Sequence, residues 1–276
     1  TYAVLGIGAP IALLGLRILQ GAAIGGEVPG AWVFVAEHVP ARRVGVACGT
    51  LTAGLTAGIL LGSLIATAVN KSLTPAEVSE WGWRVPFLLG AVLIIVAVVI
   101  RMRLKESPAF EALEEAEAKQ GEHVKQTVGQ AISTSRRNIL IGIGLRMGEN
   151  GNSSIYSALL LAYVASLPAY KGQALLSTWG AVVAALISIF TVVAFGALSD
   201  RVGRVPVYRW GALFTAVFAF PAFWLLTLGQ VWLVLLVMGV GIGIGVQSML
   251  GPQCALLPEL FGNAHRFTGV ATAREF

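Results

Sequence analysis

The 276-residue chain is 56% hydrophobic and only 12% charged, with a mean hydropathy of +0.79 and a formal net charge of +5. Soluble domains carry roughly twice that share of charged residues, so water is excluded as the only solvent of this chain. Cys48 and Cys254 have no closely spaced cysteine or histidine beside them, which argues against a disulfide framework or a metal site.

Long apolar runs recur along the chain, and most have the length that a helix needs to cross a bilayer. They are too long for barrel strands and lack period-two alternation. We therefore predict an all-α integral membrane protein with about seven full transmembrane helices. The predicted spans are 9–36, 45–69, 85–100, 138–166, 174–198, 206–229 and 231–258, and another apolar segment begins near Phe267.

The basic residues fall mainly on one side of the membrane if the predicted spans alternate. That asymmetry is typical of the cytoplasmic side and places the start of the chain outside. It also explains the positive charge without nucleic acid. The predicted cytoplasmic side holds Arg42, Arg43, the basic residues of 101–137, Arg201, Arg204, Arg209 and Arg266, and the other side holds Lys71, Arg84 and Lys171.

The polar stretch 101–137 separates three predicted spans from four. We interpret 1–100 as the C-terminal part of an N-terminal helix bundle, 101–137 as a cytoplasmic central loop and 138–276 as most of a C-terminal bundle. Within the loop, Ala109 to Lys119 predicts an amphipathic surface helix. The chain opens without a signal peptide and ends a few residues into an apolar segment, so we expect a fragment.

Two short segments resemble each other across that loop. Glu37 is followed by Arg43 and by Gly-Val-Ala from Gly45, and Glu259 is followed by Arg266 and by Gly-Val-Ala from Gly269. Both copies lie on the predicted cytoplasmic side, which indicates two halves of the same topology, as in parallel repeats. A chance resemblance of two basic loops is the alternative.

Ionisable side chains within spans are costly and are functional hypotheses by default. Arg17 lies in the first span, followed by Gln20, Gly21 and Gly25 on or near one face. The glycines would let a neighbouring helix or a solute approach Arg17. The alternative for Arg17 is a buried ion pair with another helix. Glu27 lies further toward the cytoplasm and is rotated off that face.

The densest polar patch in any span begins at Arg146 and Glu149, which are close enough to pair across one helical turn. Asn150, Asn152 and Tyr156 follow. Glycines and amides together predict a bent or locally unwound helix that lines a water-filled cavity, and a packed polar interface is the alternative. Gln247 near the centre of the last full span, and Gln253 after it, would add hydrogen-bond partners for a solute.

Glycines recur at regular spacing in two other spans. Gly54, Gly58 and Gly62 predict a face for helix packing. The glycines of 239–245 lack a preceding strand, so they do not form a dinucleotide loop.

The sole aspartate, Asp200, lies in a short loop between two spans. Gly203 permits a tight turn there, and Asp200 can accept hydrogen bonds from a helix N-terminus. Arg201 and Arg204 can meet acids or lipid phosphates. An ordinary short basic loop is the alternative.

Several motifs together resemble the major facilitator superfamily. Gly196-x-x-x-Asp200-Arg201-x-Gly203-Arg204 is similar to its signature loop, although Val205 replaces the usual final basic residue. Arg17-x-x-Gln20-Gly21 is similar to its fourth-helix motif, and Glu259 to Arg266 to its loop pattern of Glu, six residues and Arg. More narrowly, the chain resembles the metabolite:proton symporter family at Arg17 to Glu27, Trp81 to Phe87, Glu106 to Phe110 and Gly251 to Phe261. Glu149-Asn150-Gly151, with Tyr156 and Tyr163, is similar to the shikimate-transporter-like branch.

The resemblance implies a twelve-helix fold of which these spans are helices four to ten and the start of eleven. It implies proton-coupled symport of a small metabolite, such as shikimate or a dicarboxylate, by alternating access in a bacterial-type inner membrane. The proton is the coupling ion, no other cofactor is implied, and a monomer is expected. A facilitator or symporter of a zwitterionic osmolyte such as proline or betaine stays open, as does an inactive fragment.

Roles follow from these hypotheses. Glu27 and Glu149 are the candidate proton carriers, and Arg17 or Arg146 would hold an anionic solute or pair with them, with Arg17 and Glu149 favoured. A channel would need a continuous pore ring. An enzyme would need a reactive constellation, and the sequence shows no His cluster, paired aspartates or activated Ser or Cys. The predicted cytoplasmic gate comprises Glu37, Arg43, Asp200, Arg201, Arg204, Glu259 and Arg266.

Overall fold

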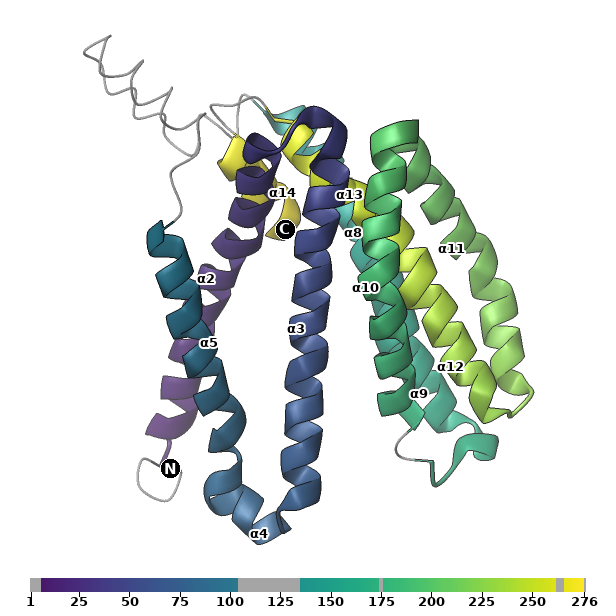
Figure 1. Ribbon diagram of the computed structural model, residues 1–276. Helices are drawn as coiled ribbons and strands as arrows, with labels where there is room; N and C mark the ends of the chain where they lie inside the picture. The colour runs from purple at the N-terminus through teal and green to yellow at the C-terminus, as the bar shows by residue number, and fades with distance from the viewer. Residues whose placement is uncertain (1–5, 104–134, 174–175, 262–265, 276) are drawn as a thin grey trace.

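The computed structural model describes residues 6–103, 135–173, 176–261 and 266–275, and every element in these ranges is helical (Figure 1). Helices suit lipid because each satisfies its backbone groups within its own segment. The predicted fold class is confirmed. The α-helices are α2 (Gly8–His38), α3 (Val44–Ser72), α4 (Pro75–Glu77), α5 (Arg84–Arg103), α8 (Arg136–Ser154), α9 (Leu160–Ser166), α10 (Leu176–Val202), α11 (Arg204–Thr227), α12 (Val231–Val240), α13 (Gln247–Glu259) and α14 (Arg266–Glu275).

Shorter segments interrupt or join these helices. They include the 3-10 turns η1 (Ala41–Arg43) and η4 (Pro168–Tyr170). Three π-helical segments are η2 (Val78–Gly82), η3 (Ile155–Leu159) and η5 (Gly241–Val246). The last two lie within longer rods, so α8, η3 and α9 run on without a break, as do α12, η5 and α13.

Among the described residues, six helical segments are long and apolar enough to cross a membrane. They coincide with six of the seven predicted spans. The seventh, 138–166, is helical throughout as α8, η3 and α9, but its polar middle makes it less hydrophobic than the others. The segment predicted near Phe267 is α14.

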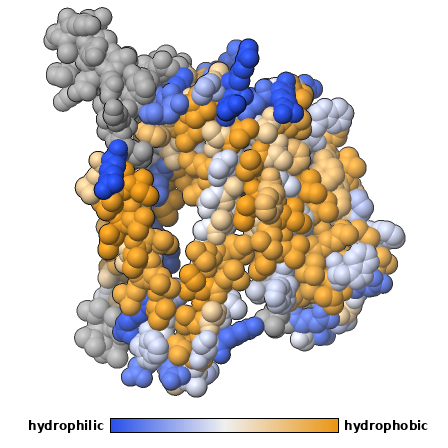
Figure 2. Space-filling model, viewed as in Figure 1, coloured by the Kyte–Doolittle hydropathy of each residue, from blue (hydrophilic) through white to orange (hydrophobic). Residues whose placement is uncertain are grey.

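Apolar side chains cover the outside of the bundle (Figure 2). Helix α5 is the extreme case, because no residue of its most apolar stretch is buried within the molecule. Lipid tails are as apolar as these side chains, so such exposure costs nothing in a bilayer. Charged side chains gather instead at the helix ends, as Figure 2 shows at the top of the view.

Two buried clusters hold the described helices together. One joins α2 and α3 to α8, α13 and α14, and it therefore connects helices from before and after the segment 104–134. The other lies within α9 to α12 and the π-helical segments beside them. The first cluster includes Trp32, Cys48, Cys254, Leu257 and Val270, and the second includes Tyr156, Leu160, Leu226 and Val234.

Helices α3 and α10 cross at close range because glycines face each other. A Cβ atom on Gly49 would lie 3.0 Å from the carbonyl oxygen of Val192, and one on Gly196 would overlap the backbone of Gly45. Gly251 of α13 meets the same part of α10, since its Cβ would lie 2.9 Å from the Gly196 nitrogen. Such small residues let helices associate in lipid, where packing replaces the hydrophobic effect.

Two expectations from the sequence need correction. The polar patch in 138–166 is not unwound, because its backbone stays helical and only changes to π-helical geometry at η3. The glycines Gly54, Gly58 and Gly62 form no packed face among the described residues, since a Cβ atom on each would meet nothing within 4 Å. The predicted helix 109–119 lies outside the described residues.

Candidate functional site

Asp200 joins α10 to the start of α3. Its Oδ1 accepts a hydrogen bond from the backbone nitrogen of Gly45 at 2.9 Å, and its Oδ2 accepts one from Val46 at 2.9 Å. The first N–H groups of a helix have no partner within the helix and carry a partial positive charge. Asp200 therefore supplies the acceptors for α3, as the sequence predicted for a helix N-terminus.

Arg204 extends this contact to α13. Its guanidinium donates to Asp200 Oδ1 at 2.5 Å and to Ser199 Oγ at 2.9 Å, and it pairs with Glu259 Oε1 at 3.1 Å. The turn that places Arg204 after α10 uses Gly203, whose φ of +105° suits glycine. Three residues of the predicted gate, Asp200, Arg204 and Glu259, are thus brought together.

A second ion pair closes the same end of the bundle. Arg266 at the start of α14 pairs with Glu37 near the end of α2, with 3.2 Å between Arg266 Nη1 and Glu37 Oε1. The arginine of one repeated loop therefore pairs with the acid of the other copy. Arg43 and Arg201, the other predicted gate residues, are exposed. We call the helix ends that carry these charges, at the top of Figure 1, the basic end.

Arg146 and Glu149 form the predicted ion pair in the middle of the rod from α8 to α9. The side chain of Glu149 is 5% exposed and that of Arg146 is 20% exposed. Tyr208 of α11 packs beside them and donates its hydroxyl to the carbonyl of Leu145 at 2.5 Å. A carboxylate so thoroughly removed from solvent needs its cation, which the neighbouring turn provides.

The other predicted residues of this rod have different surroundings. Asn150 is exposed, and Asn152 donates its side-chain amide to the carbonyl of Gly148 in its own helix at 3.0 Å. Tyr156 is fully buried, and its hydroxyl donates to the carbonyl of Thr215 at 3.1 Å. Tyr156 therefore packs in the second cluster and does not lie beside the ion pair.

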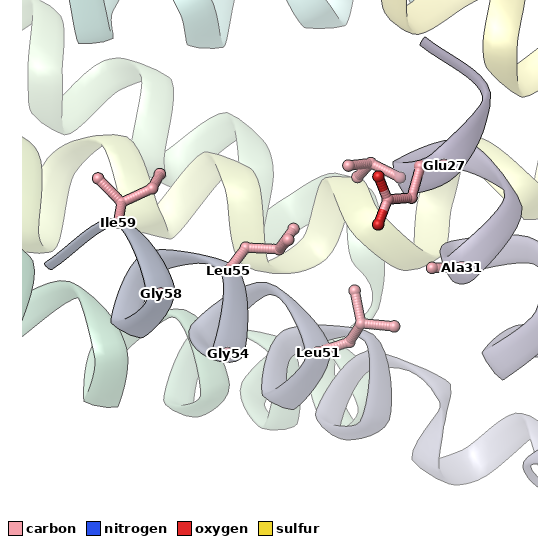
Figure 3. Close-up of a pocket in the computed structure, with 8 residues that line it drawn as sticks. Glu27, Ala31, Leu51, Gly54, Leu55, Gly58 and Ile59 are labelled. Atoms are coloured by element: carbon pink, nitrogen blue, oxygen red, sulfur yellow. The ribbon is translucent and has the colours of Figure 1, made fainter. Parts of the chain in front are cut away.

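Arg17, Gln20 and Glu27 of α2 are all exposed. Arg17 donates to Gln20 Oε1 at 3.0 Å, one turn along the helix, so these two predicted residues do meet. Glu27 lies apart from them in a groove of about 540 Å³ between α2 and α3. Figure 3 shows its carboxylate across from Leu51 and Leu55, with Ile59 further along α3. Glu27 is the only ionisable residue of the eight that line this groove.

Two buried glutamines follow η5. Gln247 donates its amide nitrogen to Ser188 Oγ at 3.1 Å, and its Oε1 has no hydrogen-bond partner among the described residues. Gln253 is fully buried, and neither polar atom of its side chain has a described partner. A buried amide without partners is unfavourable, so these side chains have hydrogen-bonding capacity that packing does not use.

Sequence reasoning missed Arg274, which lies near the Arg146–Glu149 pair, and Trp32, which contacts Arg274. Arg274 of α14 places its guanidinium 5.1 Å from the centroid of the Trp32 ring on α2. It lies within electrostatic range of both members of the pair. A signal was available, because Arg274 is an arginine within a segment predicted to enter the membrane.

These features define a multi-pass helical membrane protein in which helices from before and after the segment 104–134 meet at the basic end, with buried charges below the contact. The chain belongs to the Major Facilitator Superfamily, whose family model matches residues 1–273. It is a multi-pass inner-membrane protein of the bacterial type, which confirms the predicted family and location.

Comparison with known sequences supports that membership. The chain is 28% identical to the putative transporter YdfJ of Escherichia coli, over 100% of this chain and 64% of that protein. It is 31% identical to the proline/betaine transporter of Salmonella typhimurium, over 99% and 55%. It is 29% identical to the shikimate transporter of Escherichia coli, over 98% and 60%. The chain therefore spans a little more than half the length of these relatives.

Proposed function

We propose that the whole protein is a secondary active transporter that moves a small metabolite together with protons by alternating access. The Arg146–Glu149 pair carries this proposal. A nearly buried carboxylate in the middle of a transmembrane helix costs free energy, and such residues are therefore rare outside functional sites. Glu149 is the proposed proton carrier. Membership of a transporter superfamily and the names of the relatives support the class of activity.

The contacts at the basic end support alternating access. Asp200 holds the start of α3, and Arg266 holds Glu37, so helices from both sides of 104–134 are tied together at this end. Rocking of two helix groups about a central site requires such contacts to break in the opposite state. The described conformation is therefore the one that is closed at the basic end.

The proposed solute is an organic acid such as shikimate or a dicarboxylate. A zwitterionic osmolyte is the second candidate, because a proline/betaine transporter is among the relatives. We propose a monomer that interacts with its solute, with protons and with the lipid bilayer.

Uptake into proteoliposomes tests the proposed function. The whole protein is reconstituted, and uptake of labelled shikimate and labelled proline is measured with and without an inwardly directed proton gradient. We expect the gradient to accelerate uptake of one of the two solutes. Glu149→Gln should abolish this acceleration while downhill exchange of the solute continues, because the amide cannot release a proton.

Glu80→Gln provides the matched control, since Glu80 is exposed. It should leave the response to the gradient unchanged. Gradient-driven uptake that persists in Glu149→Gln would remove Glu149 from the coupling step. If the gradient does not change uptake by the unmodified protein, symport itself is contradicted.

A further inference from the structure

Helix α14 lies between α2 and α8, and small residues on both neighbours bring it close. A Cβ atom on Gly142 of α8 would lie 2.6 Å from that of Ala273. On the other side, a Cβ atom on Gly25 of α2 would lie 3.6 Å from Glu275 Cγ. The last turn of α14 therefore packs between a helix from before the segment 104–134 and one from after it.

Arg274 lies in this last turn of α14, and its side chain contacts Trp32 of α2. The side chain of Arg274 is 15% exposed, and its guanidinium carbon lies over the Trp32 ring, 5.1 Å from the ring centroid. The ring is fixed in turn, because Trp32 Nε1 donates to Thr52 Oγ1 at 3.3 Å. A guanidinium positioned over an aromatic face is stabilised there and can still donate hydrogen bonds to an anion.

The guanidinium of Arg274 is not fully used by the described residues. It pairs with Glu275, the next residue, whose side chain is 38% exposed. Its Nε is buried and has no hydrogen-bond partner among the described residues. Arginine has five donors in a planar fork, so a buried Nε–H without an acceptor is hydrogen-bonding capacity open to a ligand.

The position of Arg274 along its helix matches that of the Arg146–Glu149 pair. At about 1.5 Å per residue, Arg274 lies roughly 12 Å from the start of α14, and Arg146 roughly 15 Å from the start of α8. Both helices begin at the basic end. These depths are near the middle of a hydrocarbon core about 30 Å thick.

The charges of this cluster balance. Arg146 and Arg274 supply two positive charges, and Glu149 and Glu275 supply two negative charges. Helix α2 contributes Trp32 to this cluster, and Tyr208 on α11 lies within electrostatic range of Glu149. An anion entering the cluster would leave a net negative charge unless one carboxylate took up a proton.

We propose that Arg274, backed by Trp32, binds the carboxylate group of the transported solute, with Arg146 as the second cation of the site. This inference rests on the proposed function and names the chemistry of its solute. A carboxylate is planar and singly charged, which suits the fork of a guanidinium and one added proton. An organic acid and a zwitterionic osmolyte share this group, and they differ in the ammonium group, which Glu275 would meet.

Binding to the purified whole protein, without transport, tests the site. Calorimetric titration compares shikimate with its methyl ester, and glycine betaine with choline, which lacks the carboxylate. In one of these two pairs, we expect the protein to bind the compound that carries a free carboxylate (the acid) more tightly than the compound without it (its partner probe). Which pair shows the preference distinguishes an organic acid from a zwitterion.

Variants then assign the preference to Arg274. Arg274→Gln should weaken binding of the preferred acid about 10- to 100-fold, the range expected for loss of charge-assisted hydrogen bonds, and leave its partner probe unchanged. Arg274→Lys keeps the charge without the planar fork and should give an intermediate loss. Arg137→Gln is the matched control, because Arg137 is exposed at the start of α8, and it should bind as the unmodified protein does.

The possible results distinguish failure of the proposed Arg274 site from failure of the proposed proton-coupled transport. Unchanged affinity of Arg274→Gln for the preferred acid would overturn the site, even if uptake were lost. If that variant does not fold, unchanged affinity in Arg274→Lys and in Trp32→Phe would do the same. An unmodified protein with no preference for the acid would also overturn it. Acid binding that depends on Arg274, together with uptake that ignores the proton gradient, would uphold the site and contradict symport.

Discussion

Asp200 shows how one side chain can serve two helices. It lies in the last turn of α10, accepts hydrogen bonds from two backbone nitrogens of α3 and pairs with Arg204. Its side chain is only 5% exposed. Because both oxygens are used, the carboxylate cannot be replaced by its amide without loss. An amide has only one acceptor oxygen and would present N–H groups to other donors.

Asp200→Asn should therefore weaken the contact at the basic end. Loss of one acceptor and of the ion pair with Arg204 favours the conformation in which this end is open. We expect the maximal uptake rate to change several-fold while the solute concentration at half-maximal uptake stays nearly constant, since the solute site lies elsewhere. Initial rates over a range of solute concentrations measure both.

Glu80→Gln again serves as the control for a lost carboxylate on an exposed surface. An unchanged maximal rate in Asp200→Asn would mean that the cap on α3 is structural only. A changed half-saturation with an unchanged rate would place Asp200 in the solute site instead.

Glycines decide where two helices of this protein can approach each other closely. The crossing of α3 and α10 depends on Gly49 and on Gly45 facing Gly196, whereas Gly54 and Gly58, further along α3, face an open groove. One helix thus carries both kinds of glycine, with different neighbours. The spacing of glycines along α3 does not distinguish them.

Gly196→Ala should lower the free energy of unfolding by about 1–3 kcal/mol, because its methyl group would overlap the backbone of Gly45. Gly54→Ala, on the open side of α3, adds the same methyl group without a neighbour within 4 Å and should leave stability unchanged or slightly higher. Thermal unfolding in detergent compares the two. Equal melting temperatures would show that α3 and α10 do not cross at these glycines in solution.

At the scale of the molecule, the described helices from before and after the segment 104–134 are joined at the basic end. Cys48 of α3 and Cys254 of α13 are both fully buried where α2, α3 and α13 meet. Thr52 links them, since its hydroxyl lies 3.3 Å from Cys254 Sγ and donates to the carbonyl of Cys48 at 2.9 Å. Any movement that separates these helices would expose the thiols.

Thiol labelling follows this movement in the whole protein. We expect slow alkylation of Cys48 and Cys254 by a maleimide, and a several-fold faster reaction in Asp200→Asn, which favours the open conformation. Cysteine variants with one native thiol each assign the signal. Arg42→Cys, in a background without the native cysteines, should react rapidly with or without Asp200→Asn, because Arg42 is exposed. Equal labelling of the native thiols with and without Asp200→Asn would contradict the coupling between the Asp200 contact and helix separation.

The positions of the helices and several local contacts could be predicted from the sequence alone. The apolar runs predicted the helices, because a helix in lipid is specified locally by length and hydrophobicity. Local spacing likewise predicted the Arg146–Glu149 pair one turn apart, and the loop around Asp200 predicted a cap on a helix. These features depend on residues that are close in the chain or on groups that every helix start presents.

Only the tertiary structure decided which helix meets which. The sequence does not show that Asp200 caps α3, that Arg266 pairs with Glu37, or that α14 brings Arg274 onto Trp32 and beside α8. Arg43 and Arg201 are exposed in the described conformation, and their place in the gate stays a prediction. The reason is physical: in lipid, helices associate through shape and a few polar contacts, and these depend on the full arrangement of neighbours and not on hydropathy.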